Sequence, residues 1–99
     1  MAQPVYKVWF ARYKEPWYKL SIEDQNKLMG QNVESLKQVG AEEIIFCNTM
    51  WSSEEWLAWG VEKYPNIEAI QKHADYLFSI NWFQYLESKT YLGTEMPTS

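Results

Sequence analysis

His73 is the only histidine in the 99-residue chain, and its side chain is the one whose ordinary pKa lies closest to neutral pH. A histidine half-buried over a pocket can serve as a general base or as a haem ligand. His73 falls at the edge of the apolar arc of a helix predicted from Asn66 to about Ile80. A boundary histidine that hydrogen-bonds to a carbonyl group or to water is the alternative interpretation.

Three polar side chains interrupt apolar, strand-like stretches of the sequence: Arg12, Asn48 and Glu62. If they are buried they need partners, because an unpaired charge or amide costs several kcal/mol, on the order of 2–7 kcal/mol for an amide. A pocket floor would supply those partners, and Trp59 could stack against a planar ligand. The predicted ligand-binding set is therefore Arg12, Asn48, Trp59, Glu62 and His73, with His73 as the catalytic candidate. The alternatives are an Arg12–Glu62 ion pair near a rim or at solvent-exposed strand ends, and tryptophans that serve only core or interface packing.

Charge and cysteine content exclude several classes of function. Nine basic against thirteen acidic residues give a formal charge of −4, so nucleic acid and anionic membranes are not expected partners. No apolar run approaches the ~20 residues of a membrane span, and the chain start has no signal-peptide pattern, so a cytoplasmic location is expected. Cys47 is the only cysteine, which rules out an intrachain disulfide, and a single histidine makes a zinc site implausible. We expect no metal and no cofactor.

The strand-like segments carry apolar residues on both faces of the predicted strand. In the run from Val5 to about Lys14, Val5, Trp9, Ala11 and Tyr13 share one face, and Tyr6, Val8 and Phe10 share the other. Further strands are predicted at Glu43 to about Met50, about Glu55 to Tyr64, and about Trp82 to Tyr91. The third has a helical alternative, because Ser52 and Glu55 fit a capping box. High aromatic content and Gly60 favour the strand.

Two helices are predicted between these strands. The first begins near Ser21, whose side chain can cap it together with Asp24, and ends before Gly40. The second begins with Asn66 as its cap and ends near Ser79 or Ile80. The order strand–helix–strand, strand–helix–strand predicts an α+β, ferredoxin-like βαββαβ domain over residues 1–99, with a four-stranded antiparallel sheet and both helices on one face. The other face would be bare and apolar, so a homodimer is the expected partner.

Several motifs resemble the dimeric α+β barrel superfamily, and in particular its uncharacterised short members. They are Pro16-Trp17-x-x-Leu20-Ser21-x-Glu23, Gly40-Ala41-Glu42, Trp59-Gly60-Val61, and the stretch from His73 through Trp82-Phe83-x-Tyr85. The resemblance implies two protomers that pair their sheets into a barrel. In the haem-degrading branch a helix-two histidine ligates iron near a strand-three tryptophan and a strand-one asparagine; His73 and Trp59 match the first two, and strand one has no asparagine. The cofactor-free monooxygenase branch uses asparagine, tryptophan and arginine, for which Asn48, Trp51, Trp59 and Arg12 offer the residue types.

The sequence thus predicts a small homodimeric protein that binds a small apolar or aromatic organic molecule between sheet and helices. Turnover by a cofactor-independent monooxygenase or isomerase reaction would extend this function. The alternatives are a non-catalytic dimerisation or interaction module and, third, a haem-binding monooxygenase.

Overall fold

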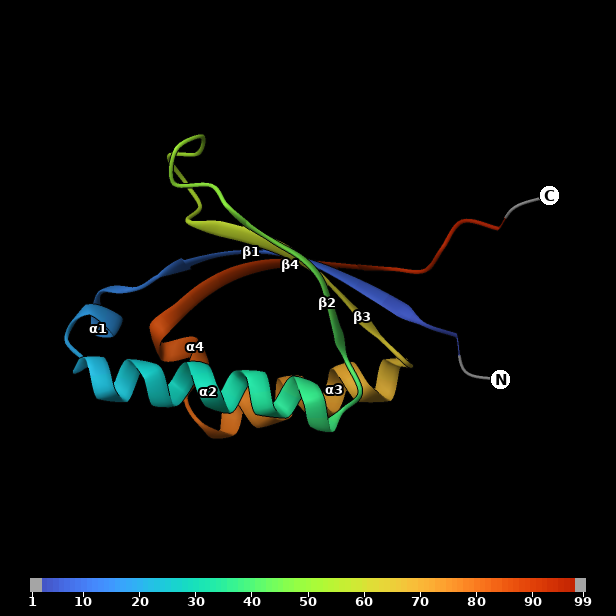
Figure 1. Cartoon of the computed structure of the whole chain (residues 1–99), viewed down its shortest axis with the longest axis horizontal. Coiled ribbons are helices and arrows are strands. Elements are labelled where there is room, and N and C mark those ends of the chain that lie inside the picture. Colours follow the sequence, from blue (N-terminus) through green and yellow to red (C-terminus); the bar gives the residue numbers. More distant parts are fainter. Residues whose placement is uncertain (1–2, 98–99) are drawn as a thin grey trace.

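The computed structural model describes residues 3–97 and shows two layers, a sheet and a layer of helices on one of its faces (Figure 1). The elements follow the order β1, α1, α2, β2, β3, α3, α4, β4. The four strands are antiparallel to their neighbours, and the sheet order is β2-β3-β1-β4. This is the predicted α+β, ferredoxin-like arrangement. The bounds are β1 Val5–Tyr13, α1 Glu15–Tyr18, α2 Ile22–Gln38, β2 Glu42–Asn48, β3 Ala58–Tyr64, α3 Ile67–Ser79, α4 Trp82–Tyr85 and β4 Leu86–Gly93.

Local signals in the sequence account for the helix ends. The Ser21 hydroxyl accepts a hydrogen bond from the Asp24 backbone N–H (3.0 Å) at the start of α2. Asn66 Oδ1 accepts one from the Ala69 N–H (2.8 Å) at the start of α3. Gly40 has a φ of 78° just beyond α2, a left-handed conformation that favours glycine. The predicted start of each long helix is therefore confirmed by its capping bond.

One predicted strand is partly wrong. The segment Trp82–Tyr85 forms the short helix α4, and strand β4 begins only at Leu86. Asn81 adopts a left-handed conformation (φ 60°) and its carbonyl accepts a hydrogen bond from Gln84 N–H, which closes a turn where the alternation indicated a strand. Trp82 is buried, so tertiary packing overrides the strand preference of its aromatic neighbours.

The strand prediction for the segment before Tyr64 is confirmed from Ala58 onward, and its helical alternative is wrong. The residues before Ala58 form a turn instead, in which the Thr49 hydroxyl donates to the Trp56 carbonyl (2.8 Å) and Ser53 Oγ accepts from the Trp56 N–H (3.0 Å). The connection between β2 and β3 extends away from the helices, on the other side of the sheet (Figure 1).

The sheet and the helices are packed together by two separate clusters at opposite ends of β1. At the Val5 end lies a hydrophobic cluster of β1, α2, β3 and α3 side chains: Val5, Leu36, Tyr64, Ala69 and Ile70. At the Tyr13 end lies an aromatic cluster, in which Tyr13 stacks on Trp17 with ring centroids 4.4 Å apart, and Tyr85 lies 6.4 Å from Trp17. The middle of β1 lies between these clusters.

The second face of the sheet carries mostly apolar side chains at its centre. Strand alternation and pairing place Val8, Phe10, Trp59 and Val61 on the face opposite to the helices. Charged side chains border them, including the Arg12–Glu87 ion pair (2.8 Å). Tyr91 on β4 and Ile45 on β2 are about half exposed on the same face. Both faces of the folded sheet therefore carry apolar side chains, as the sequence pattern of the strands predicts.

Candidate functional site

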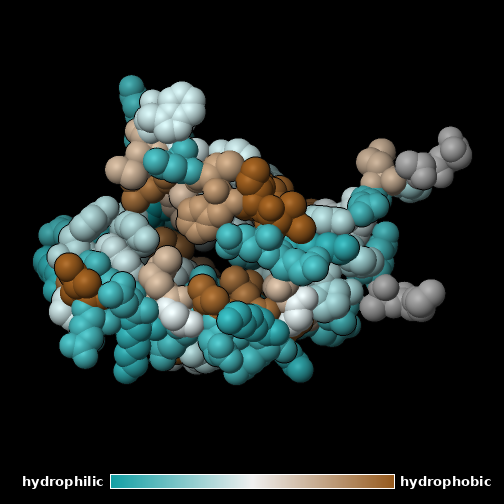
Figure 2. Space-filling view, viewed as in Figure 1, coloured by the Kyte–Doolittle hydropathy of each residue, from teal (hydrophilic) through white to brown (hydrophobic). Residues whose placement is uncertain are grey.

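A cavity of about 120 Å³ lies between the sheet and the helices, over the middle of β1. The molecule is visibly hollowed between its two layers, and hydrophobic side chains border the opening (Figure 2). The volume approaches the roughly 150 Å³ of an engineered apolar cavity that binds benzene. Most of the wall is apolar or aromatic and comes from both layers of the fold: Trp9, Ala11 and Tyr13 of β1, Met29 of α2, Phe46 of β2, Leu57 just before β3, Ala58 of β3, Leu77 of α3, Trp82 and Phe83 of α4, and Leu86 of β4.

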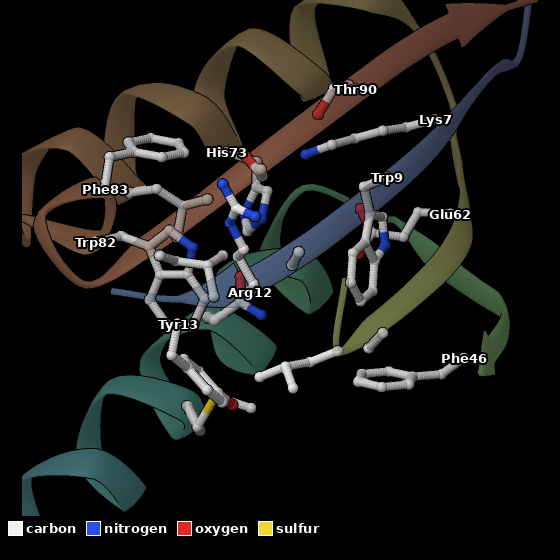
Figure 3. A pocket seen from close by; sticks show the side chains of 18 of the residues that line it. Lys7, Trp9, Arg12, Tyr13, Phe46, Glu62, His73, Trp82, Phe83 and Thr90 are labelled. Atoms are coloured by element: carbon white, nitrogen blue, oxygen red, sulfur yellow. The ribbon is translucent and has the colours of Figure 1, made fainter. Parts of the chain in front are cut away.

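Three titratable side chains gather at one part of this wall: Lys7 from β1, Glu62 from β3 and His73 from α3. Lys7 and Glu62 are register partners on adjacent strands, so their side chains lie next to each other on the helix-facing side of the sheet. The amine end of Lys7 points toward His73 (Figure 3). The cavity therefore has an apolar body and one polar region.

His73 is fixed in the protein interior. Its side chain is only 2% exposed, and a hydrogen bond of 2.8 Å joins its Nδ1 to the Ser35 hydroxyl of α2. Burial, and secondarily the positive charge of Lys7, lowers the pKa of His73 to about 4. The imidazole is therefore neutral at pH 7, and its surroundings disfavour the protonated form.

Glu62 is also buried, and its partner is Tyr64 on the same strand, whose hydroxyl donates a 2.7 Å hydrogen bond to Glu62 Oε1. Burial, together with the neighbouring Glu62 carboxylate, raises the pKa of Tyr64, so the phenol keeps its proton and remains a donor. The hydrogen bond between Tyr64 and Glu62 fixes the position of both side chains in the polar region.

Two hydrogen-bond donors of β1 lack partners within residues 3–97. The Trp9 indole Nε1 is buried and has no hydrogen-bond acceptor. The Lys7 amine makes no hydrogen bond and no ion pair within the 4.0 Å limit to any residue in that range. Buried donors without partners are uncommon, because an unmade hydrogen bond costs about 1–3 kcal/mol. The Trp9 Nε1 in the cavity wall is such a donor, and the amine of the half-buried Lys7 is a second donor that a ligand could contact.

The five residues predicted from sequence lie in different places. Glu62 and His73 both line the cavity. Arg12 borders it, but its guanidinium pairs with Glu87 rather than with Glu62 and lies 5.3 Å from the Trp56 ring. Asn48 Oδ1 accepts a hydrogen bond from the Met50 N–H in the β2–β3 connection, and Trp59 belongs to the other face of the sheet.

Sequence reasoning missed Lys7, Trp9 and Ser35 as contributors to the polar region. Lys7 carried a signal, because it occupies the alternation of Val5, Trp9, Ala11 and Tyr13 and is the one charged residue on that face within the apolar stretch. Ser35 carried none, since its pairing with His73 spans 38 positions of sequence.

A haem does not fit this site as it is built. Drug-sized ligands already need roughly 300–1,000 Å³, while the cavity beside His73 measures about 120 Å³. The His73 ring is enclosed, and the amine of Lys7 points at its cavity side.

Within the described residues, no three histidine, cysteine, aspartate or glutamate side chains gather as a metal site. The same part of the chain contains no helix that is both long enough and apolar enough for a membrane crossing.

No protein-family model and no curated protein matches this chain. Solved structures do match it. A mutant of chlorite dismutase from Candidatus Nitrospira defluvii superposes with a TM-score of 0.76 at 9% identity, over 99% of this chain and 42% of that one. This match shows the fold, which is the ferredoxin-like α+β arrangement.

Two further structures share this fold at similar length. RPA0582, a protein of unknown function from Rhodopseudomonas palustris, has a TM-score of 0.70 at 12% identity and covers 99% of this chain and 86% of that one. The hydroxynitrile lyase of Passiflora edulis has a TM-score of 0.58 at 11% identity and covers 99% and 100%. The chain spans less than half of the chlorite dismutase chain, so it corresponds to one part of that larger protein. The resemblance expected from the sequence motifs is confirmed at the level of the fold.

Proposed function

We propose that this protein binds a compact, largely apolar or aromatic organic molecule that carries one hydrogen-bond acceptor, in the cavity between sheet and helices. The observation that supports this most directly is the cavity itself, with aromatic walls and two unpartnered donors, Lys7 and Trp9. The acceptor of the ligand would satisfy those donors, while its apolar body would contact Trp9, Leu77 and Trp82.

A cofactor-independent isomerase or monooxygenase reaction would further require a general base, and His73 is the candidate for that role because it lines the cavity beside this position. Catalysis of this kind extends the binding function and depends on it. The alternative of a purely non-catalytic interaction module predicts only water-sized voids, and a cavity of about 120 Å³ favours ligand binding over it.

Ligand binding can be tested with benzyl alcohol, benzoate and toluene as probes, followed by backbone amide NMR. We expect benzyl alcohol or benzoate to shift the amide signals around the cavity and to bind at least about tenfold more tightly than toluene, because only they offer an acceptor to Lys7 and Trp9. Ala58→Leu should weaken binding of all three probes, since the longer side chain occupies the cavity.

Lys37→Met is the matched control, because Lys37 lies exposed near the end of α2 and away from the cavity. The proposal fails if no probe shifts the cavity amides, or if Ala58→Leu binds the probes as well as the unsubstituted protein does.

We also propose that two copies pair through the sheet faces opposite to the helices, as the apolar centre around Val8, Phe10 and Val61 indicates. Sedimentation at micromolar concentration should then give a species of twice the 11.8 kDa chain mass. Val61→Lys should shift it to the monomer, because it places a charge in the centre of this face. Val33→Lys, at an exposed position of α2, should leave the dimer intact. A monomeric unsubstituted protein would contradict the pairing.

A further inference from the structure

The amine of Lys7 lies in the protein interior, at the wall of the cavity, whereas most lysine amines extend into solvent. It projects from the middle strand β1 into the space between the two layers rather than into solvent, and it lines the cavity together with Trp9 (Figure 3). No described carboxylate pairs with it within 4.0 Å, although Glu62 is its register partner, and the Glu62 carboxylate is already bonded to the Tyr64 hydroxyl. Its amine is therefore available to a ligand in the cavity.

The surroundings of Lys7 make its amine easier to deprotonate than the amine of an exposed lysine. Burial lowers the pKa of Lys7, and the nearby Glu62 offsets part of that effect. The other titratable groups that line the cavity are Arg12 and Tyr13 of β1, Glu43 of β2 and His73 of α3, which stays neutral; Tyr64, bonded to Glu62, stays protonated. A desolvated lysine in an apolar pocket is the form of lysine that acts as a nucleophile toward carbonyl carbon.

We propose that Lys7 condenses with a small aldehyde or ketone held in the cavity and forms an imine with it. The inference rests on the proposed function, since it places the ligand in the same cavity and assigns its acceptor as a carbonyl oxygen.

The amine lone pair forms a bond to the carbonyl carbon while the carbonyl π electrons move to oxygen, and a proton passes from nitrogen to that oxygen. The resulting carbinolamine loses its hydroxyl group with one further proton as water, which leaves the C=N bond. No oxidant or reductant is needed, because both hydrogens of the released water come from the amine.

Reductive trapping tests this assignment. The protein is incubated with benzaldehyde and cyanoborohydride, and each modified lysine is located by peptide mass spectrometry. We expect Lys7 to acquire the benzyl group at least about tenfold faster than the exposed Lys27 and Lys37. 2-Naphthaldehyde, which is too large for the cavity, should lose this preference. Labelling of Lys7 at the same rate as, or more slowly than, Lys27 and Lys37 would overturn the proposal.

Two measurements keep this test separate from that of ligand binding. Excess benzyl alcohol should slow the labelling of Lys7 and leave Lys37 unaffected, and Ala58→Leu should reduce labelling of Lys7 only. If benzyl alcohol binds in the cavity and Lys7 shows no preferential labelling, imine formation is wrong while the binding function stands. If Lys7 is labelled equally in Ala58→Leu, the cavity does not direct the reaction and the inference is also overturned. Lys7→Met, which removes a poorly solvated charge, provides a folded control in which that label is absent.

Discussion

Gly60→Ala is expected to lower the free energy of unfolding by about 2–3 kcal/mol, the upper part of the range for overpacked interiors. Gly60 lies in β3, where a Cβ would meet Trp9 Cζ2 at 2.7 Å and the Ile45 carbonyl oxygen at 2.9 Å. The indole ring cannot move freely, because it packs edge-on against Phe46 with ring centroids 5.2 Å apart. The Ile45 carbonyl belongs to the neighbouring strand, so it cannot move without disturbing the sheet.

Urea denaturation measures this effect as a lower midpoint with an unchanged slope. Gly30→Ala is the control with the opposite sign. Gly30 lies in α2 with nothing within 4 Å of a built Cβ, so alanine there should stabilise the protein by about 0.5–1 kcal/mol. Equal effects of the two substitutions would show that the tight contact between Gly60 and Trp9 is absent. Since Trp9 forms part of the cavity wall, Gly60→Ala should also weaken ligand binding beyond its cost in stability.

The second large effect is acid sensitivity centred on His73. The folded-state pKa of about 4 lies below the unfolded value of about 6.5, so the unfolded chain takes up a proton first as the pH falls. The stabilisation that depends on neutral His73 is complete above about pH 6.5 and is lost between there and pH 4. It amounts to on the order of 3 kcal/mol, a large part of the 5–15 kcal/mol typical of a whole domain.

Because the chain has one histidine, its ring protons can be followed by NMR without ambiguity, and the midpoint should lie near pH 4. The unfolding free energy of His73→Gln should depend less on pH than that of the unsubstituted protein, since glutamine does not titrate. Parallel pH profiles for the two proteins would contradict the buried, neutral state. Lys7→Met should raise the midpoint, because it removes the positive charge that acts on His73.

The fold could be read from the sequence because its elements carry local signals. Ser21, Asn66 and Gly40 mark helix ends through short-range bonds and backbone conformation, and those bonds form in the structure. Helix α4 could not be read in this way, because the left-handed Asn81 and the burial of Trp82 depend on packing against elements far away in the sequence. The strand-like alternation of aromatic residues includes Trp82–Tyr85, although this segment is helical and the strand begins only at Leu86.

The candidate site was less accessible to sequence reasoning. His73 and Glu62 stand out as polar residues in apolar surroundings, and both line the cavity. Trp59 was also predicted from sequence to contact a ligand, but it lies on the opposite face of the sheet. Strand alternation alone does not say which face the helices cover. Lys7 and Trp9 matter because they lack partners, a property that exists only once the neighbours of each side chain are known.

The cavity lies between two separate clusters, the hydrophobic one at the Val5 end and the aromatic one at the Tyr13 end of β1. These clusters act as spacers that set the distance between the sheet and the helices. A bulkier or smaller side chain in either cluster changes that distance over the cavity without altering any residue that a ligand touches. Residues such as Leu36 and Trp17 can therefore tune the size of the accepted molecule, so related chains with the same cavity lining need not share a ligand.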